Sequence, residues 1–146
     1  QAIEELQGPF ERSRAAWLAG TDYNWTIEDR GTREFLGRIS IRREPAAGQW
    51  SLGFWVHPTH QGHGYAREAA SAIVEFGFER LAAERITAAH AAWNQASGKV
   101  LVGIGMTFVR VNPRGFMKRG GWVEEREYEI QRQRRAIRPS PARPTR

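Results

Sequence analysis

The hydrophobic and polar positions of residues 50–82 predict an apolar strand, a glycine-rich turn and an amphipathic helix. Residues 52–56 are almost all apolar, which is typical of a central strand buried on both faces. After residue 65, apolar side chains recur every three or four positions and charged side chains take the opposite face, as in a helix that covers a sheet. The apolar stripe consists of Ala66, Ala69, Ala70, Ile73, Val74, Phe78 and Leu81, with Gly77 on the same face for close packing.

Weaker patterns predict further elements on both sides of this unit. Upstream, we expect a short helix in residues 1–7, a break at Gly8-Pro9 and a second helix over residues 10–19. Three strands then form a meander, at residues 24–29, 34–43 and 49–56. Downstream, we expect a strand at 85–92, a helix at 95–104, a strand at 107–112, a loop at 113–121 and a last strand within 122–133. This order predicts an α/β (α+β) domain, a mixed and mostly antiparallel sheet with helices on both faces.

The turn between the central strand and the helix, residues 61–66, has the features of an anion-binding loop. Gly62 and Gly64 let the backbone approach a ligand without intervening side chains. The first N–H groups of the following helix have no partner within the helix, and the helix dipole favours negative charge there. A Walker loop would need Gly-Lys-Ser/Thr, and a dinucleotide motif would need glycine where Arg67 stands. The turn therefore indicates a phosphate or pyrophosphate ligand of another kind.

This strand, the turn Q-x-x-G-x-A and the helix resemble motif A of the GNAT (Gcn5-related N-acetyltransferase) superfamily. The downstream segment Asn94-Gln95-Ala96-Ser97, followed by Val100-Leu101 and Gly105-Met106, resembles the N-x-x-S signature of its RimJ/RimL branch, which acetylates the N-termini of ribosomal proteins. Leu36-Gly37-Arg38-Ile39 and Gly53-Phe54-Trp55-Val56 fit the same branch. The resemblance covers residues 25–131 and implies the GNAT fold. Because only part of the family's usual N-terminal region precedes the meander, we expect its first edge strand to be absent.

The resemblance implies acetyl-CoA as co-substrate and direct attack by a primary amine in a ternary complex. In the family, the turn binds the pyrophosphate, mainly through backbone N–H groups, and the strand before it pairs with the pantetheine arm. Asn94 would hydrogen-bond the pantetheine, although asparagine is also a favoured helix N-cap, and the two roles are compatible. The implied cofactor-binding residues are Phe54, Trp55, Val56, Gln61, Gly62, His63, Gly64, Tyr65, Ala66, Asn94 and Ser97.

Two residues are candidates for proton transfer. In the resembling branch, a serine at the position of Ser97 can protonate the leaving thiolate, and the alternative is a helix serine that bonds its own backbone. Some members carry a glutamate as base where a rough alignment puts Phe116. His57 is a candidate base because an unperturbed histidine titrates near neutrality. A structural role for His57 beside Pro58 and a water relay are the alternatives.

Composition narrows the function classes. The 146 residues suit one domain, which we expect over residues 1–131, followed by a basic Pro/Arg-rich tail over 132–146. Six arginines of the tail account for the whole net charge of +6, so the charge does not indicate a folded nucleic-acid surface. The absence of Cys excludes disulfides and fits a cytoplasmic protein, and no apolar run is long enough to span a membrane. We expect no metal site from His57, His60, His63 and His90, since metal sites usually recruit carboxylate or Cys as well.

Three function classes stay open. The first is an acetyltransferase acting on a protein N-terminus or on a small amine such as an antibiotic or polyamine. The second is a GNAT-fold coenzyme A binder without turnover. The third is a nucleic-acid or ribosome-binding module that uses the arginine-rich tail, and its binding would fall steeply with salt. The oligomeric state also stays open, and pairing of sheet edges would give a homodimer.

Overall fold

The computed structural model describes residues 2–133, and their side chains from residue 11 onward. The tail from residue 134 lies outside the described residues. The elements in chain order are α1 (Ala2–Ala19), β1 (Asp22–Glu28), β2 (Phe35–Arg43), β3 (Gln49–Val56), the 3₁₀ helix η1 (Pro58–His60), α2 (Tyr65–Arg80), β4 (Arg85–Ala91), α3 (Gln95–Gly103), β5 (Thr107–Lys118) and β6 (Gly121–Gln131). Within residues 2–133, no helix has the length and apolar character needed to cross a membrane.

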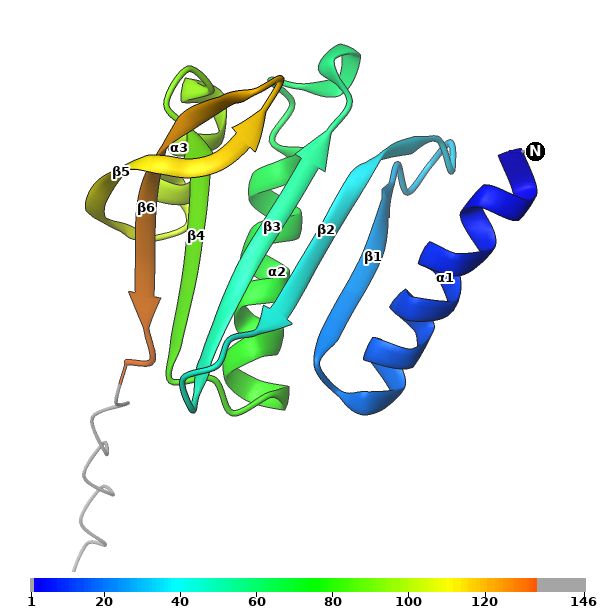
Figure 1. Ribbon diagram of the computed structural model, residues 1–146, viewed down its shortest axis with the longest axis horizontal. Coiled ribbons are helices and arrows are strands. Elements are labelled where there is room, and N and C mark those ends of the chain that lie inside the picture. The colour runs from blue at the N-terminus through cyan, green and yellow to red at the C-terminus, as the bar shows by residue number, and fades with distance from the viewer. Residues whose placement is uncertain (1, 134–146) are drawn as a thin grey trace, which may run out of the picture.

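The strands form one six-stranded sheet in the order β1-β2-β3-β4-β6-β5 (Figure 1). β3 and β4 run parallel, and every other neighbouring pair is antiparallel. The predicted mixed, mostly antiparallel sheet is thus confirmed. α2 lies behind the sheet with α3 beside it, so these two helices share one face instead of lying on opposite faces (Figure 1).

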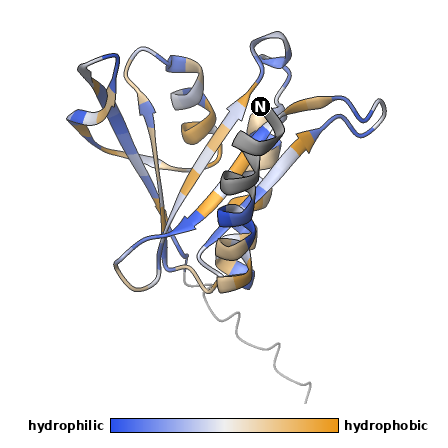
Figure 2. Ribbon diagram, turned by 45° about the vertical axis from the view of Figure 1, so that its right-hand side comes forward, coloured by the Kyte–Doolittle hydropathy of each residue, from blue (hydrophilic) through white to orange (hydrophobic). Residues whose placement is uncertain are grey.

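The hydrophobic core lies between the sheet and α2. Hydrophobic and hydrophilic residues alternate along the strands (Figure 2), and β1 to β4 and β6 each turn apolar side chains toward the core. Ile41 and Ile86 are fully buried in this layer. A Cβ added to Gly77 of α2 would lie 2.8 Å from Cδ1 of Ile86 and 2.9 Å from Cδ1 of Ile41. The glycine therefore lets α2 approach the sheet closely, as predicted.

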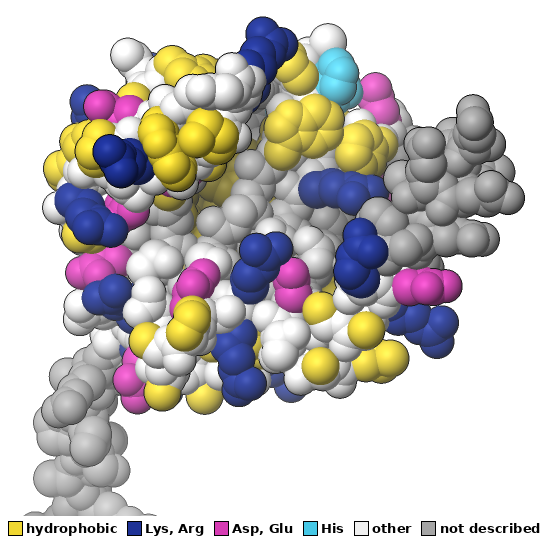
Figure 3. All heavy atoms as spheres, in the orientation of Figure 1, with side chains coloured by type: hydrophobic (Ala, Val, Ile, Leu, Met, Phe, Trp, Pro, Cys, Tyr) yellow, Lys and Arg dark blue, Asp and Glu magenta, His cyan; other side chains and the backbone are white. Residues whose placement is uncertain are grey.

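The other face of the sheet is open in the described part of the chain. Ser51, Gly53 and Trp55 of β3 point to this face, and Trp55 is 49% exposed. Figure 3 looks onto it and shows acidic and basic side chains mixed. The prediction that β3 is buried on both faces is therefore wrong. The segment looked apolar because its outward positions hold a glycine and a half-exposed tryptophan.

α1 runs without interruption from Ala2 to Ala19, so the predicted break at Gly8-Pro9 is wrong. A proline removes one backbone hydrogen bond from a helix and disfavours it, but packing elsewhere can outweigh that cost. Trp17 supplies such packing, because its ring centroid lies 5.0 Å from Tyr23 and 5.3 Å from Trp25 in edge-to-face contacts. Phe76 of α2 packs on the same two rings.

β5 continues to Lys118, so the predicted loop over 113–121 is wrong for its first six residues. The register shifts between Asn112↔Glu125 and Phe116↔Val123, which leaves three residues of β5 opposite one residue of β6. This bulge accommodates a proline and a glycine within a strand. Pairing then resumes to Lys118↔Gly121, and Arg119 and Gly120, both with positive φ, form a two-residue hairpin loop.

Candidate functional site

The parallel strands β3 and β4 separate partway along their length. They pair from Gln49↔Arg85 to Leu52↔Ala88 and not beyond, which leaves the end of β3 without a partner on that side. A cavity of about 350 Å³ lies at this open end, lined by β3, the turn before α2 and the start of α3. It brings together ten of the predicted site residues: Phe54, Trp55, Val56, Gln61, Gly62, Gly64, Tyr65, Ala66, Asn94 and Ser97.

The turn at the start of α2 presents its backbone to the cavity. Gly62 and Gly64 have φ of +83° and +81°, a left-handed conformation that favours glycine. Nothing lies within 4 Å of a Cβ added to either residue, so the space beside the backbone is open. Gly64 is the N-cap of α2 and provides no side-chain cap, which leaves the first N–H groups of α2 available to an anion. Gln61 donates from Nε2 to the Val56 carbonyl at 3.1 Å and ties the turn to β3.

Basic side chains also line the cavity, and two of them could not be singled out from the sequence. Arg67 lies in the first turn of α2 and packs toward α3, where a Cβ added to Gly103 would lie 3.4 Å from its Nε. Lys99 lies two residues after Ser97 and also lines the cavity. Together with the N-terminus of α2 they make this a site suited to a phosphorylated ligand. The signal in the sequence was a basic residue in the first two turns of each helix.

α3 brings Asn94 and Ser97 to the opposite wall. The Oδ1 of Asn94 accepts a hydrogen bond from the Ser97 N–H at 3.3 Å, so Asn94 caps α3. Gly98, the next residue, would place an added Cβ 2.7 Å from Nε2 of His90, so only glycine lets α3 sit this close to β4. The buried His90 is held at both nitrogens, by the Ala91 carbonyl at 2.8 Å and the Tyr128 hydroxyl at 3.3 Å.

Two predicted residues lie outside the cavity lining. His57 caps η1, where its Nδ1 accepts from the Thr59 N–H at 3.3 Å and lies 2.7 Å from the Thr59 hydroxyl. His63 stacks on Tyr65, and its Nδ1 lies 3.3 Å from the His60 carbonyl oxygen. Among residues 2–133, no group of three or more His, Cys, Asp or Glu side chains is placed to hold a metal ion.

The fold and the sequence both have known relatives. In solved structures, RimJ from Mycobacterium smegmatis in complex with CoA-disulfide superposes with a TM-score of 0.80 at 24% identity, over 88% of this chain and 62% of that one. The ribosomal-protein-S5-alanine acetyltransferase from Vibrio fischeri gives a TM-score of 0.80 at 18% identity, over 88% and 71%. At these identities the likeness shows a shared fold.

Sequence comparison identifies the family. The uncharacterized N-acetyltransferase YoaA of Bacillus subtilis is 28% identical over 106 residues, which are 72% of this chain and 60% of YoaA. The chain spans between 50% and 60% of the length of the curated relatives it matches. Residues 2–107 match the family model of the acetyltransferase (GNAT) domain. The chain therefore belongs to the GNAT acetyltransferase family.

Proposed function

We propose that the protein transfers an acetyl group from acetyl-CoA to a primary amine, and that the amine is the α-amine of a protein N-terminus. The cavity where the open end of the β3–β4 pair meets the starts of α2 and α3 carries this proposal. Family membership supports the reaction class. The acceptor class is supported by structural neighbours described as acetyltransferases of ribosomal proteins.

The cavity has the parts needed to hold acetyl-CoA. The turn 61–66, the uncapped start of α2 and Arg67 would bind the pyrophosphate. The backbone of Phe54–Val56 is not paired with β4. It would therefore hydrogen-bond the pantetheine arm, as the edge of a sheet bonds an added strand. The CoA-disulfide bound to the RimJ neighbour supports a ligand of this type.

The chemistry follows from these positions. When bound, acetyl-CoA supplies the acetyl group as a thioester. A backbone N–H of β3 would polarise the thioester carbonyl, since a fixed donor aimed at developing charge stabilises the transition state. The Ser97 hydroxyl would protonate the leaving thiolate from the α3 wall. The amine must lose a proton as it attacks, and an α-amine with a pKa of about 8 is already partly neutral at physiological pH.

The binding half of the proposal is tested by the melting temperature with and without acetyl-CoA, at low and at high salt. Ligand at 100 times its Kd adds about 2.7 kcal/mol to the free energy of unfolding. We expect a rise of several degrees that persists at high salt, because the backbone and the apolar strand contribute to the site. No rise at saturating acetyl-CoA would contradict the proposal.

The acceptor class is tested with a panel of amines. Peptides that begin with Ser or Ala represent protein N-termini, and spermidine represents a small polyamine. Because the chain contains no Cys, a thiol-reactive dye reports only released coenzyme A. We expect turnover with the peptides. Turnover with spermidine and none with any peptide would identify a small-amine acetyltransferase instead.

A further inference from the structure

The open face of the sheet gives access to the separation of β3 and β4 from the side opposite α2 and α3. A second hollow of about 560 Å³ lies on this face and reaches the last paired residues, Leu52 and Ala88 (Figure 3). On the separated part of β4, the small Ala89 lines this hollow, and Ala91 lies two residues further on, on the same face of the strand. An amine that attacks a thioester held along β3 therefore has room to approach from this face.

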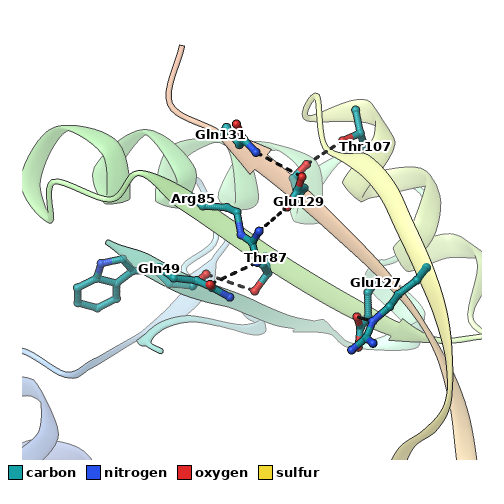
Figure 4. Close-up of polar contacts among 9 residues, drawn as sticks. Gln49, Arg85, Thr87, Thr107, Glu127, Glu129 and Gln131 are labelled. Atoms are coloured by element: carbon teal, nitrogen blue, oxygen red, sulfur yellow. Dashed lines mark hydrogen bonds and ion pairs between the residues drawn. The ribbon is translucent and has the colours of Figure 1, made fainter. Parts of the chain in front are cut away.

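Three glutamates of β6 face the same side at alternate positions, and two of them have cationic partners. Glu129 forms an ion pair with Arg85, with 3.2 Å between Oε2 and Nη1 (Figure 4). Glu127 forms an ion pair with the Arg110 guanidinium. Glu125 is the third. Among the described residues, no side chain forms a hydrogen bond or an ion pair with Glu125. Its carboxylate is therefore available to an incoming group.

The register of the sheet puts Glu125 at the separated end. It pairs with Ala91 of β4, three residues beyond the last β3–β4 pair at Ala88. In Figure 1, β5 passes in front of the upper ends of β6 and β4, so the hairpin closes over this part of the face. Neighbouring strands lie about 4.8 Å apart. The single strand β4 thus separates a carboxylate on β6 from the gap between β3 and β4, a span that a glutamate side chain and one water can bridge.

The bulge in β5 makes room for the Glu125 side chain. A Cβ added to Gly115 would lie 2.3 Å from Cγ of Glu125 and 2.5 Å from its Oε2. Any larger residue at this position would displace the carboxylate. Bulges occur next to active sites, where they redirect a side chain. The bulge and its glycine thus hold Glu125 in place.

The surroundings give Glu125 and Glu127 different proton affinities. Burial raises the pKa of the Glu125 carboxyl and the charge of Glu127 raises it further, while His90 on the other side of β4 lowers it. The hydrogen bond from Arg110 lowers the pKa of Glu127. A general base works best when its pKa lies near the working pH. The other charged groups nearby are Arg114 in the bulge and, on the helix side of β6, Glu124 and Arg126.

We propose that Glu125 is the general base of the acetyl transfer, an assignment that rests on the function proposed above. As the amine nitrogen bonds to the acetyl carbon, Glu125 takes its proton, directly or through one water. The C–S bond breaks, and the sulfur takes a proton from Ser97. Both residues then exchange protons with water, so that an amine and a thioester become an amide and a thiol. His57, the base predicted from the sequence, instead caps η1, with its Nδ1 held by Thr59.

The test compares Glu125→Gln with Glu124→Gln in the full chain. Glu125→Gln keeps the size of the side chain and removes its ability to take a proton. Glu124 is the matched control, because it is the adjacent residue, is exposed and faces the other side of β6. Transfer from acetyl-CoA to a peptide that begins with Ser or Ala is followed by thiol release from about pH 6 to about pH 10, a range that spans the ordinary pKa of an α-amine. The melting temperature with acetyl-CoA reports binding.

For Glu125→Gln at neutral pH we expect kcat/KM to fall about 100-fold or more, with the acetyl-CoA-induced rise in melting temperature unchanged. The deficit should shrink toward the alkaline end, where the amine arrives neutral. Glu124→Gln should match the wild type. Gly115→Ala, which displaces the carboxylate without removing it, should lower the rate and leave cofactor binding intact.

Three results would overturn the assignment: wild-type rates in Glu125→Gln, an equal loss in Glu124→Gln, or a deficit that does not change with pH. A wild-type protein that binds acetyl-CoA and acetylates no amine would instead overturn the proposed function, and the assignment with it. Loss of the acetyl-CoA response in Glu125→Gln would show that the residue acts in binding, which also contradicts the assignment.

Discussion

Replacing Gly64 by alanine tests whether the turn at the start of α2 binds the cofactor through its backbone. Gly64 has a φ of +81°, a conformation that costs an alanine about 1 to 2 kcal/mol. Nothing lies within 4 Å of the Cβ that alanine would add, so we expect no clash beyond that cost. The new methyl group would stand beside the N–H groups that a phosphate must reach, and it should therefore weaken binding.

Gly120→Ala is the matched control. Gly120 has a φ of +76°, its added Cβ also meets nothing within 4 Å, and it lies in the β5–β6 hairpin loop outside the cavity lining. Both variants should lose about 1 to 2 kcal/mol in urea denaturation, or about 3 to 8 °C in melting temperature for a domain of this size. Titration calorimetry should show acetyl-CoA affinity lowered about tenfold or more, a change of about 1.4 kcal/mol, in Gly64→Ala alone.

Equal acetyl-CoA affinities in the two variants would refute the reasoning. A methyl group at Gly64 would then affect binding no more than a methyl group at Gly120, which lies outside the cavity lining. A much larger stability loss in Gly64→Ala than in Gly120→Ala would also refute it, since the turn would then be packed and not open to a ligand.

Further substitutions at three residues test the site and the sheet. Asn94→Ala should lower the free energy of unfolding, measured in urea, by about 1 kcal/mol, because it removes the α3 cap. Asn94→Asp should keep the stability of the wild type, because aspartate is also a favoured N-cap. Weaker acetyl-CoA binding by Asn94→Asp would then indicate the expected contact between Asn94 and the pantetheine. Ser97→Ala should lower kcat and keep the acetyl-CoA-induced rise in melting temperature, because a proton donor to the leaving group acts in the reaction and not in binding; an unchanged kcat would contradict this role. Glu127→Gln should lower the free energy of unfolding by about 0.5 kcal/mol at neutral pH, since the Glu127–Arg110 pair is partly exposed. The hydrogen bond from Arg110 lowers the pKa of Glu127 below its ordinary 4.5, so the stabilisation by this pair is present above pH 4.5 and is lost as the pH falls through the folded-state pKa. The free energies of unfolding of the wild type and Glu127→Gln should therefore converge below that pKa. A difference in free energy that persists at lower pH would contradict the pairing.

The strand–turn–helix unit could be predicted because its signals are local. Periodicity alone defined α2, and the same stripe correctly placed Gly77 against the sheet. The two glycines of the turn mark positions where the backbone takes positive φ. Each of these features depends on a few neighbouring residues, so a single sequence contains the information.

The features that the sequence did not predict depend on partners far along the chain. Pro113 and Gly115 are typical of a loop, but β6 pairs on both sides of them and turns the segment into a bulge. Pro9 is typical of a helix end, yet α1 continues past it. In the β5 segment, pairing with β6 outweighed the local preference of Pro113 and Gly115.

The same distinction applies to the site. Asn94 and Ser97 belong to a motif of fixed spacing, so their place on the cavity wall could be expected. Arg67 and Lys99 belong to no motif and reach the cavity because α2 and α3 lie side by side. Glu125 could not be distinguished from the other glutamates of β6 without the pairing that gives Glu127 and Glu129 their arginines.

The most direct test of the central claim is the mass of a peptide beginning with Ser or Ala after incubation with the protein and acetyl-CoA. The account predicts that the peptide gains the mass of one acetyl group, on its α-amine. A peptide that is already blocked at its N-terminus should show no gain in mass. An unmodified peptide and unmodified spermidine, under conditions where acetyl-CoA raises the melting temperature, would contradict the claim that this GNAT domain transfers the acetyl group it binds.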